Sequence, residues 1–162
     1  MEDVFSSLAG LALTVIVAGL VTFLGVWLFE RATRDVDEWA ELRRGNLAVG
    51  IVMAAFVVAV GIIVRPALQE PLIVADVGRS RPFYELLVNA VGLLIALMLA
   101  IVAVGLAVWL FTRMTTDLDE WVELMEGNQA VALLMAGVVL AVALLTATAV
   151  DRIVVALTDA IF

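Results

Sequence analysis

Apolar residues gather in four long runs that contain no charged residue. These runs are Leu8–Phe29, Leu47–Val64, Leu86–Phe111 and Ala130–Val150. A helix needs roughly 17–25 apolar residues to cross about 30 Å of hydrocarbon, and each run meets that requirement. The pattern therefore predicts an all-α integral membrane protein with four transmembrane helices.

One polar stretch occurs twice between these runs, as RDVDEWAELRRGNLAV at 34–49 and TDLDEWVELMEGNQAV at 116–131. Aligning 26–49 with 108–131 leaves sixteen of twenty-four positions identical. The identities include Asp, Glu, Trp, Gly and Asn, which an apolar composition does not explain. We therefore expect two tandem two-helix repeats, over residues 1–81 and 82–162.

The duplicated unit has two spans, and this even number predicts the orientation of the second copy. Two such units enter the membrane the same way round, so the repeats are parallel and both polar stretches lie on one face. A pseudo-twofold axis along the membrane normal is then expected. The arginines slightly favour the polar stretches inside and both termini outside.

The polar stretch itself has the spacing of a short interfacial helix. In the first copy, apolar and acidic positions recur every third residue in two parallel stripes, and the second copy repeats them. The apolar positions are Val36, Trp39, Leu42, Leu118, Trp121 and Leu124. The candidate acidic surface comprises Asp35, Asp37, Glu38, Glu41, Asp117, Asp119, Glu120 and Glu123. It is either a solvated helix face or a surface for a basic partner or a cation.

A Gly-Asn pair ends each polar stretch, as Gly45-Asn46 and Gly127-Asn128. Glycine accommodates the left-handed conformation common at helix ends, and Asn is a good N-cap for the span that follows. The pairs are therefore predicted to act as hinge and cap. An alternative is that the two Asn amides face a shared polar vestibule.

Four tryptophans lie at the ends of the spans, two of them inside the polar stretches as Trp39 and Trp121. Tryptophan is enriched at membrane–water interfaces because its ring is amphipathic. Trp39 and Trp121 are also candidate anchors for a partner.

Small residues recur every fourth position in the spans and indicate where helices pack closely. They include Gly10, Thr14, Ala18 and Thr22 in the first span and Gly92, Ala96 and Ala100 in the third. All three prolines fall within 65–82, which predicts an irregular connection there. An apolar stripe over 153–161 predicts a further short interfacial helix.

The overall composition supports a lipid environment and limits the chemistry. The hydrophobic share is 65% and the mean hydropathy +1.16, whereas soluble domains are roughly 45–50% apolar. The net charge of −8 argues against a nucleic-acid partner. The chain has no cysteine and no histidine, and the spans carry no carboxylate. We expect no catalytic residue, no metal site and no cofactor, and hence no enzyme.

The pattern D-E-W-x-E-L-x-x-G-N-x-A-V, at 37–49 and again at 119–131, resembles the YjfL-like family of small prokaryotic inner-membrane proteins of unknown function. The resemblance covers essentially the whole chain. It implies a multipass protein of the prokaryotic cytoplasmic membrane and no established activity.

Two non-enzymatic functions are compatible with these features. The first is a self-associating homo-oligomeric scaffold that docks a basic protein through its paired acidic loops. The alternative is an oligomeric cation channel, with carboxylates at its mouth and polar residues along a pore. The candidate pore residues are Thr14, Thr22, Asn89, Thr146 and Thr148.

Overall fold

The computed structural model describes residues 2–33, 37–69, 82–115 and 119–159. The described residues form six α-helices and no strand, which confirms the all-α prediction. The helices are α1 Glu2–Ala32, α2 Glu38–Arg43, α3 Leu47–Gln69, α4 Pro82–Met114, α5 Glu120–Met125 and α6 Gln129–Asp159.

Four of these helices are long and apolar enough to cross a membrane. The candidate spans are Thr14–Ala32, Leu47–Leu68, Ala90–Met114 and Gln129–Ile153. They agree with the four apolar runs in number and order. The chain is therefore a multipass membrane protein.

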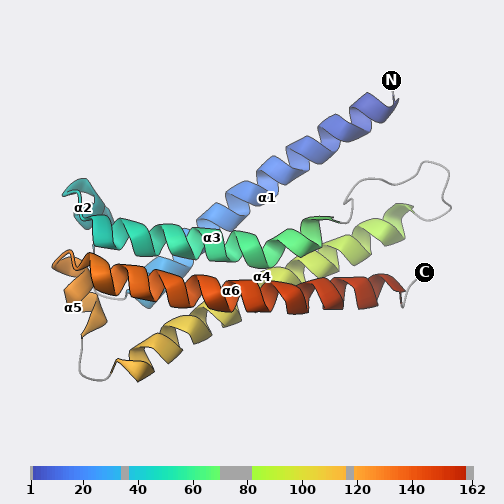
Figure 1. Cartoon of the computed structure of the whole chain (residues 1–162). Coiled ribbons are helices and arrows are strands. Elements are labelled where there is room, and N and C mark those ends of the chain that lie inside the picture. The colour runs from blue at the N-terminus through green and yellow to red at the C-terminus, as the bar shows by residue number, and fades with distance from the viewer. Residues whose placement is uncertain (1, 34–36, 70–81, 116–118, 160–162) are drawn as a thin grey trace.

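The long helices form one bundle with the two short helices at the same end (Figure 1). Helices α3 and α6 run side by side in the same direction and make the most extensive contact in the molecule. Helix α1 packs against α3, and α4 packs against α6. The ribbon of α1 diverges from the bundle toward its N-terminus, which lies at the same end as the C-terminus.

The contact between α1 and α3 depends on one glycine and one aromatic pair. A Cβ added to Gly25 would lie 2.5 Å from the Val57 Cα atom, so any larger residue would push the two backbones apart. The Phe29 and Phe56 rings meet edge to face, with centroids 5.4 Å apart. Close backbone approach and aromatic packing together hold this end of α1 against α3.

The expected pseudo-twofold relation between the repeats is wrong. A twofold axis requires matching contacts, so that α3 would meet α4 just as α6 meets α1. Helix α3 does pack against α4, but the described parts of α6 and α1 form no comparable contact. The two repeats instead associate through unlike faces.

Two predicted segments are also corrected by the structure. Helix α6 continues without a break to Asp159, so 153–159 is not a separate interfacial helix; neither Gly nor Pro interrupts the chain there. Both ends of the predicted irregular connection are helical, because Pro66 lies inside the last turns of α3 and Pro82 begins α4. Proline suits the first turn of a helix, where its missing N–H is not needed. Residues 70–81 lie outside the described residues.

The small-residue positions behave differently in the two repeats. Ala96 and Ala100 of α4 are fully buried. Thr14, Ala18 and Thr22, which occupy the corresponding face of α1, are exposed. The spacing therefore marks a packed face in α4, whereas the same face of α1 is uncovered within one chain.

Ala96→Leu is expected to lower the thermal stability of the detergent-solubilised protein. The larger side chain has no space at a fully buried site, and overpacking typically costs about 1–3 kcal/mol. Ala90→Leu is the matched control, because Ala90 is exposed on the same helix. Equal melting temperatures for the two variants would contradict close packing at Ala96.

A labelling experiment tests the side of the membrane on which α2 and α5 lie. Arg43 and Met125 occupy equivalent positions of the two short helices, and both are exposed. The chain contains no native cysteine, so in the single variants Arg43→Cys and Met125→Cys the introduced thiol is the only one that can react. An impermeant thiol reagent should label both from the same side of sealed vesicles. Labelling from opposite sides would contradict the arrangement in Figure 1.

Candidate functional site

The helices α2 and α5, together with the Gly-Asn pair that follows each, form the site that we call the paired junction. Each short helix begins at an aspartate that caps it. The Asp37 Oδ1 atom accepts a hydrogen bond from the Ala40 N–H at 2.8 Å, and Asp119 Oδ1 accepts one from the Val122 N–H at 3.3 Å. These bonds satisfy N–H groups that have no partner inside the helix.

Each short helix ends at a glycine in the left-handed conformation, Gly45 with φ 80° and Gly127 with φ 83°. The Gly45 N–H donates to the Leu42 carbonyl at 3.0 Å, and the Asn46 N–H donates to the Glu41 carbonyl at 3.0 Å. The second copy repeats both bonds. This is the Schellman arrangement, which reverses the chain while satisfying carbonyls at the helix end.

The two asparagines then cap the long helices α3 and α6. Asn46 Oδ1 accepts hydrogen bonds from the Ala48 and Val49 N–H groups, and Asn128 Oδ1 does the same for residues 130 and 131. Each Nδ2 group also donates back to a glutamate of the preceding short helix. The distances are 3.0 Å to Glu41 and 2.6 Å to Glu123. One side chain thus ties each short helix to the span that follows it.

Asn46 additionally joins the two repeats. Its Nδ2 group donates to the Leu124 carbonyl at 2.9 Å and to the Met125 carbonyl at 3.1 Å, both in α5. Among the described residues, the hydrogen bonds of Asn128 are confined to its own repeat. The amide of Asn46 therefore holds α5 next to the first junction.

Asn46 also determines the charge state of Glu41. Its hydrogen bond, assisted by the Arg44 guanidinium 2.6 Å away, lowers the pKa of Glu41 below the ordinary value of 4.5. The folded state therefore favours the ionised carboxylate. The resulting stabilisation is present above pH 4.5 and is lost as the pH falls through the lowered pKa.

The carboxyl groups of Glu38 and Glu120 are buried, so neither belongs to the expected acidic surface. Glu38 accepts a hydrogen bond from the Thr33 hydroxyl. In the second copy, the Thr115 hydroxyl donates to the Phe111 carbonyl at 2.9 Å, and Glu120 Oε1 has no hydrogen-bond partner. Glu38 faces inward because its carboxylate meets Thr33 at the end of the preceding span.

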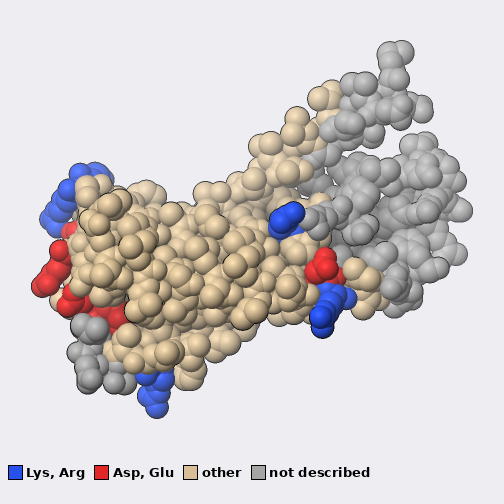
Figure 2. All heavy atoms as spheres, in the orientation of Figure 1, with Lys and Arg blue, Asp and Glu red and all other residues tan. Residues whose placement is uncertain are grey.

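The remaining carboxylates give this end of the molecule an acidic surface (Figure 2). Asp37, Asp119 and Glu126 are exposed, whereas Glu41 and Glu123 are half-buried. Asp35 and Asp117 lie outside the described residues. Within the described ranges, no group of three carboxylates is placed to hold a metal ion.

The two predicted tryptophan anchors occupy different environments. Trp39 is exposed, and its Nε1–H donates to Glu30 at 3.1 Å. Trp121 is half-buried and packs against the core. Only Trp39 presents most of its ring to the surroundings.

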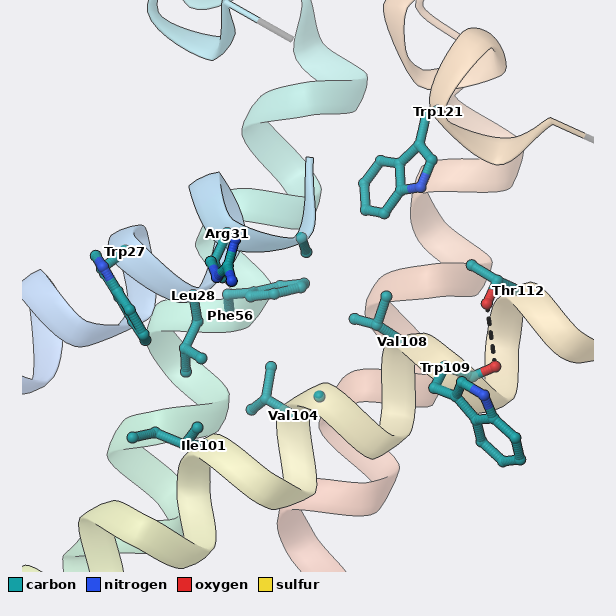
Figure 3. A pocket seen from close by; sticks show the side chains of 12 residues that line it. Trp27, Leu28, Arg31, Phe56, Ile101, Val104, Val108, Trp109, Thr112 and Trp121 are labelled. Atoms are coloured by element: carbon teal, nitrogen blue, oxygen red, sulfur yellow. Dashed lines mark hydrogen bonds between the residues drawn. The ribbon is translucent and has the colours of Figure 1, made fainter. Parts of the chain in front are cut away.

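A cleft of about 600 Å³ lies beside the junction, between α1 and α4 (Figure 3). Phe56 of α3 and Trp121 of α5 contribute to its wall. Its other lining residues are Trp27, Leu28, Arg31, Ala32, Ile101, Val104, Gly105, Val108, Trp109 and Thr112. Its walls are mainly apolar and aromatic, which suits an apolar chain better than a polar substrate. The sequence pointed to Trp27 and Trp109 only as interfacial residues, because a cleft between two helices has no local signature.

Three of the predicted pore residues use their hydroxyl groups within their own helices. The hydroxyls of Thr22, Thr146 and Thr148 each donate to a carbonyl of their own helix, at 2.9, 2.8 and 2.7 Å. Such bonds satisfy a hydroxyl in an apolar environment. The side chain of Asn89 lies outside the part that the structure describes.

Asn46→Asp is expected to destabilise the dissociated chain in detergent more than Asn128→Asp does. Both variants keep an oxygen that can cap the next helix, and both lose the donor to the neighbouring glutamate. Only Asn46→Asp also loses the two bonds to α5, at about 1 kcal/mol each. Thermal unfolding at neutral pH measures the difference.

Lowering the pH should reduce the destabilisation by Asn46→Asp, because protonation removes the repulsion between the new carboxylate and Glu41. Equal unfolding temperatures for the two variants at neutral pH would contradict a stabilising link between the repeats.

Comparison with known proteins shows a family but no activity. A family model described as Domain of Unknown Function (DUF350) matches the chain twice, over residues 3–99 and 84–162. Neither a curated protein nor a solved structure matches the chain. The narrower YjfL-like resemblance stays a prediction. Because the two matches together cover nearly the whole chain, the protein belongs to the DUF350 family of domains of unknown function.

Proposed function

We propose that this protein is a non-enzymatic, self-associating scaffold of the prokaryotic cytoplasmic membrane. Its paired junction docks a basic segment of a partner protein. The observation that carries the proposal is the bond from Asn46 to α5, which brings the carboxylates of both repeats together at one end of the bundle.

The charge balance at this end supports a basic partner. Six described carboxylates outside the buried pair lie at the junction and the adjoining helix ends, together with four arginines. The carboxylates are Glu30, Asp37, Glu41, Asp119, Glu123 and Glu126, and the arginines are Arg31, Arg43, Arg44 and Arg113. The excess of negative charge attracts a cationic segment, most strongly at low ionic strength.

The exposed carboxylates are also preorganised. Asp37 and Asp119 each use one oxygen to cap a helix, which fixes the side chain while the other oxygen stays accessible. A partner that binds them loses little side-chain entropy at the interface, because these groups are already ordered. Preorganised carboxylates suit Arg or Lys side chains of a docked segment.

A carbodiimide reagent tests this proposal directly in isolated membranes. It couples carboxylates to nearby amines, and the chain contains no lysine, so a cross-link from the junction to a lysine-bearing peptide identifies a different protein. We expect a coupled partner whose lysines map to Asp37, Asp119 or Glu126 by mass spectrometry. The yield should fall as the salt concentration rises.

The variant Asp37→Asn/Asp119→Asn/Glu126→Gln should abolish this coupling without unfolding the protein. Asn is as good an N-cap as Asp, so only the charges are lost. Asp151→Asn, an exposed acid at the other end of α6, is the control and should leave the coupling unchanged. Unchanged coupling in the triple variant would contradict the proposal. A cation-selective current from the purified protein in bilayers would favour the channel instead.

A further inference from the structure

The contact between the two repeats buries different faces of equivalent helices. Val52 and Ile63 of α3 are 0% exposed, whereas the equivalent Leu134 and Leu145 of α6 are 59% and 74% exposed. The residues are similar in kind, so composition does not explain the difference. Helix α3 packs against α6 and α4 of the second repeat, whereas among the described residues no helix gives the equivalent side of α6 a comparable cover.

A continuous face of α3, which we call the forward face, is buried along the helix. It comprises Ala48, Val52, Ala55, Ala59, Ile63 and Ala67. The equivalent residues of α6 are Ala130, Leu134, Gly137, Ala141, Leu145 and Ala149, and all six are exposed. The second repeat therefore carries the same forward face without a partner in the described structure.

The opposite difference occurs on one face of α4 and α1, which we call the back face. In the second repeat, Ala96, Ala100 and Val104 of α4 are buried. Their equivalents in α1 are Thr14, Ala18 and Thr22, and these are exposed. The first repeat thus exposes a face whose equivalent is buried on α4, a helix that packs against α3 and α6.

The junctions show the same direction of association. Asn46, at the forward end of the first repeat, donates to the carbonyls of residues 124 and 125 in the second repeat. Among the described residues, Asn128 makes no such bond outside its own repeat. The equivalent acceptors for Asn128 are the carbonyls of Leu42 and Arg43 in another copy.

We infer that a second copy of this chain docks head to tail, its α1 back face against the α6 forward face of the first copy. The inference rests on the self-association in the proposed function and specifies its surfaces. The chain already contains one contact between its repeats, in which α3 packs against α4 and, more extensively, against α6. An interface between unlike faces leaves one face of each kind open, so repetition adds further copies and gives a ring where the rotation between copies closes.

The occupant of the α6 face is a second copy rather than an unrelated helix, because the matching surface is present on the same chain. Ala18 and Ala141 correspond to Ala100 and Ala59, which are fully buried on α4 and α3, two helices that pack against each other. Small residues at these positions let two helices approach closely, and packing of this kind drives association in lipid. The Asn128 amide adds polar bonds at the junction end.

Cysteine cross-linking in native membranes distinguishes this mode from other dimers. The chain has no native cysteine, so Ala18→Cys and Ala141→Cys are unique probes. When both forms are co-expressed, an oxidant should produce a disulfide-linked dimer. Neither form expressed alone should cross-link, because unlike faces do not bring a residue next to its own copy. The variant that carries both cysteines should give a series of cross-linked products larger than the dimer, or closed covalent rings.

Leu20→Cys paired with Ala141→Cys is the matched control. Leu20 lies half a turn from Ala18 on α1, and both it and its equivalent Val102 are exposed. This pair should cross-link at least tenfold less. Ala18→Trp provides a second test, because it should dissociate the copies while the thermal unfolding of the dissociated chain is unchanged.

Two results would overturn the inference in different ways. A monomer by native mass spectrometry, released from membranes with its lipids, would contradict both head-to-tail docking and the self-association in the proposed function. An oligomer in which Ala18→Cys alone cross-links to itself, or in which the Ala18–Ala141 pair does not cross-link, would contradict the head-to-tail mode alone. Coupling of a basic partner at the junction would still support the scaffold.

Discussion

The requirement that every backbone polar group near the membrane be satisfied governs how this chain turns between its spans. Each turn contains the end of a short helix and the start of a long one, and both leave N–H or carbonyl groups without helical partners. In both turns, a glycine with positive φ and the asparagine after it provide hydrogen-bond partners for these groups, at Gly45-Asn46 and Gly127-Asn128. Because the turns are rigid, the directions of α3 and α6 follow from them. The bundle is assembled on these two helices.

Most carboxylates of the repeated stretch form hydrogen bonds within the chain that stabilise the turns. Asp37 and Asp119 cap the short helices, Glu41 and Glu123 accept from the Asn amides, and Glu38 is buried against Thr33. This structural use explains why the acidic pattern is the same in both repeats. It also limits the surface open to a partner to a few groups, chiefly the exposed Asp37, Asp119 and Glu126.

Duplication has produced two units that are alike in sequence and unlike in surroundings. The amide of Asn46 reaches α5, while that of Asn128 stays within its own repeat. Glu38 has a hydroxyl partner, while one oxygen of Glu120 has none. Such differences arise because the two repeats meet through different faces, so equivalent residues have different neighbours. Identical residues therefore make different contacts in the two copies.

The sequence alone determined the four apolar spans, their order and the chemistry of the turns. Four charge-free runs can exist only as membrane helices, and Gly followed by Asn marks a helix end because few residues adopt positive φ or cap so well. Local patterns also indicated the caps at Asn46 and Asn128. They misplaced Glu38 and Glu120, since a stripe on a six-residue helix does not show which side meets the core.

Only the tertiary structure decided how the two repeats meet. The sequence suggested a pseudo-twofold, because equivalent residues in two copies are the natural basis for equivalent contacts. Whether Ala18 and Ala100 share an environment depends on which helix covers each, and that is a property of the packing and not of either residue. The cleft beside Trp27 and Trp109 likewise depends on how the helices pack. In lipid, apolar faces gain little from burial itself, so the close fit of backbones selects the partner, and that fit exists only in three dimensions.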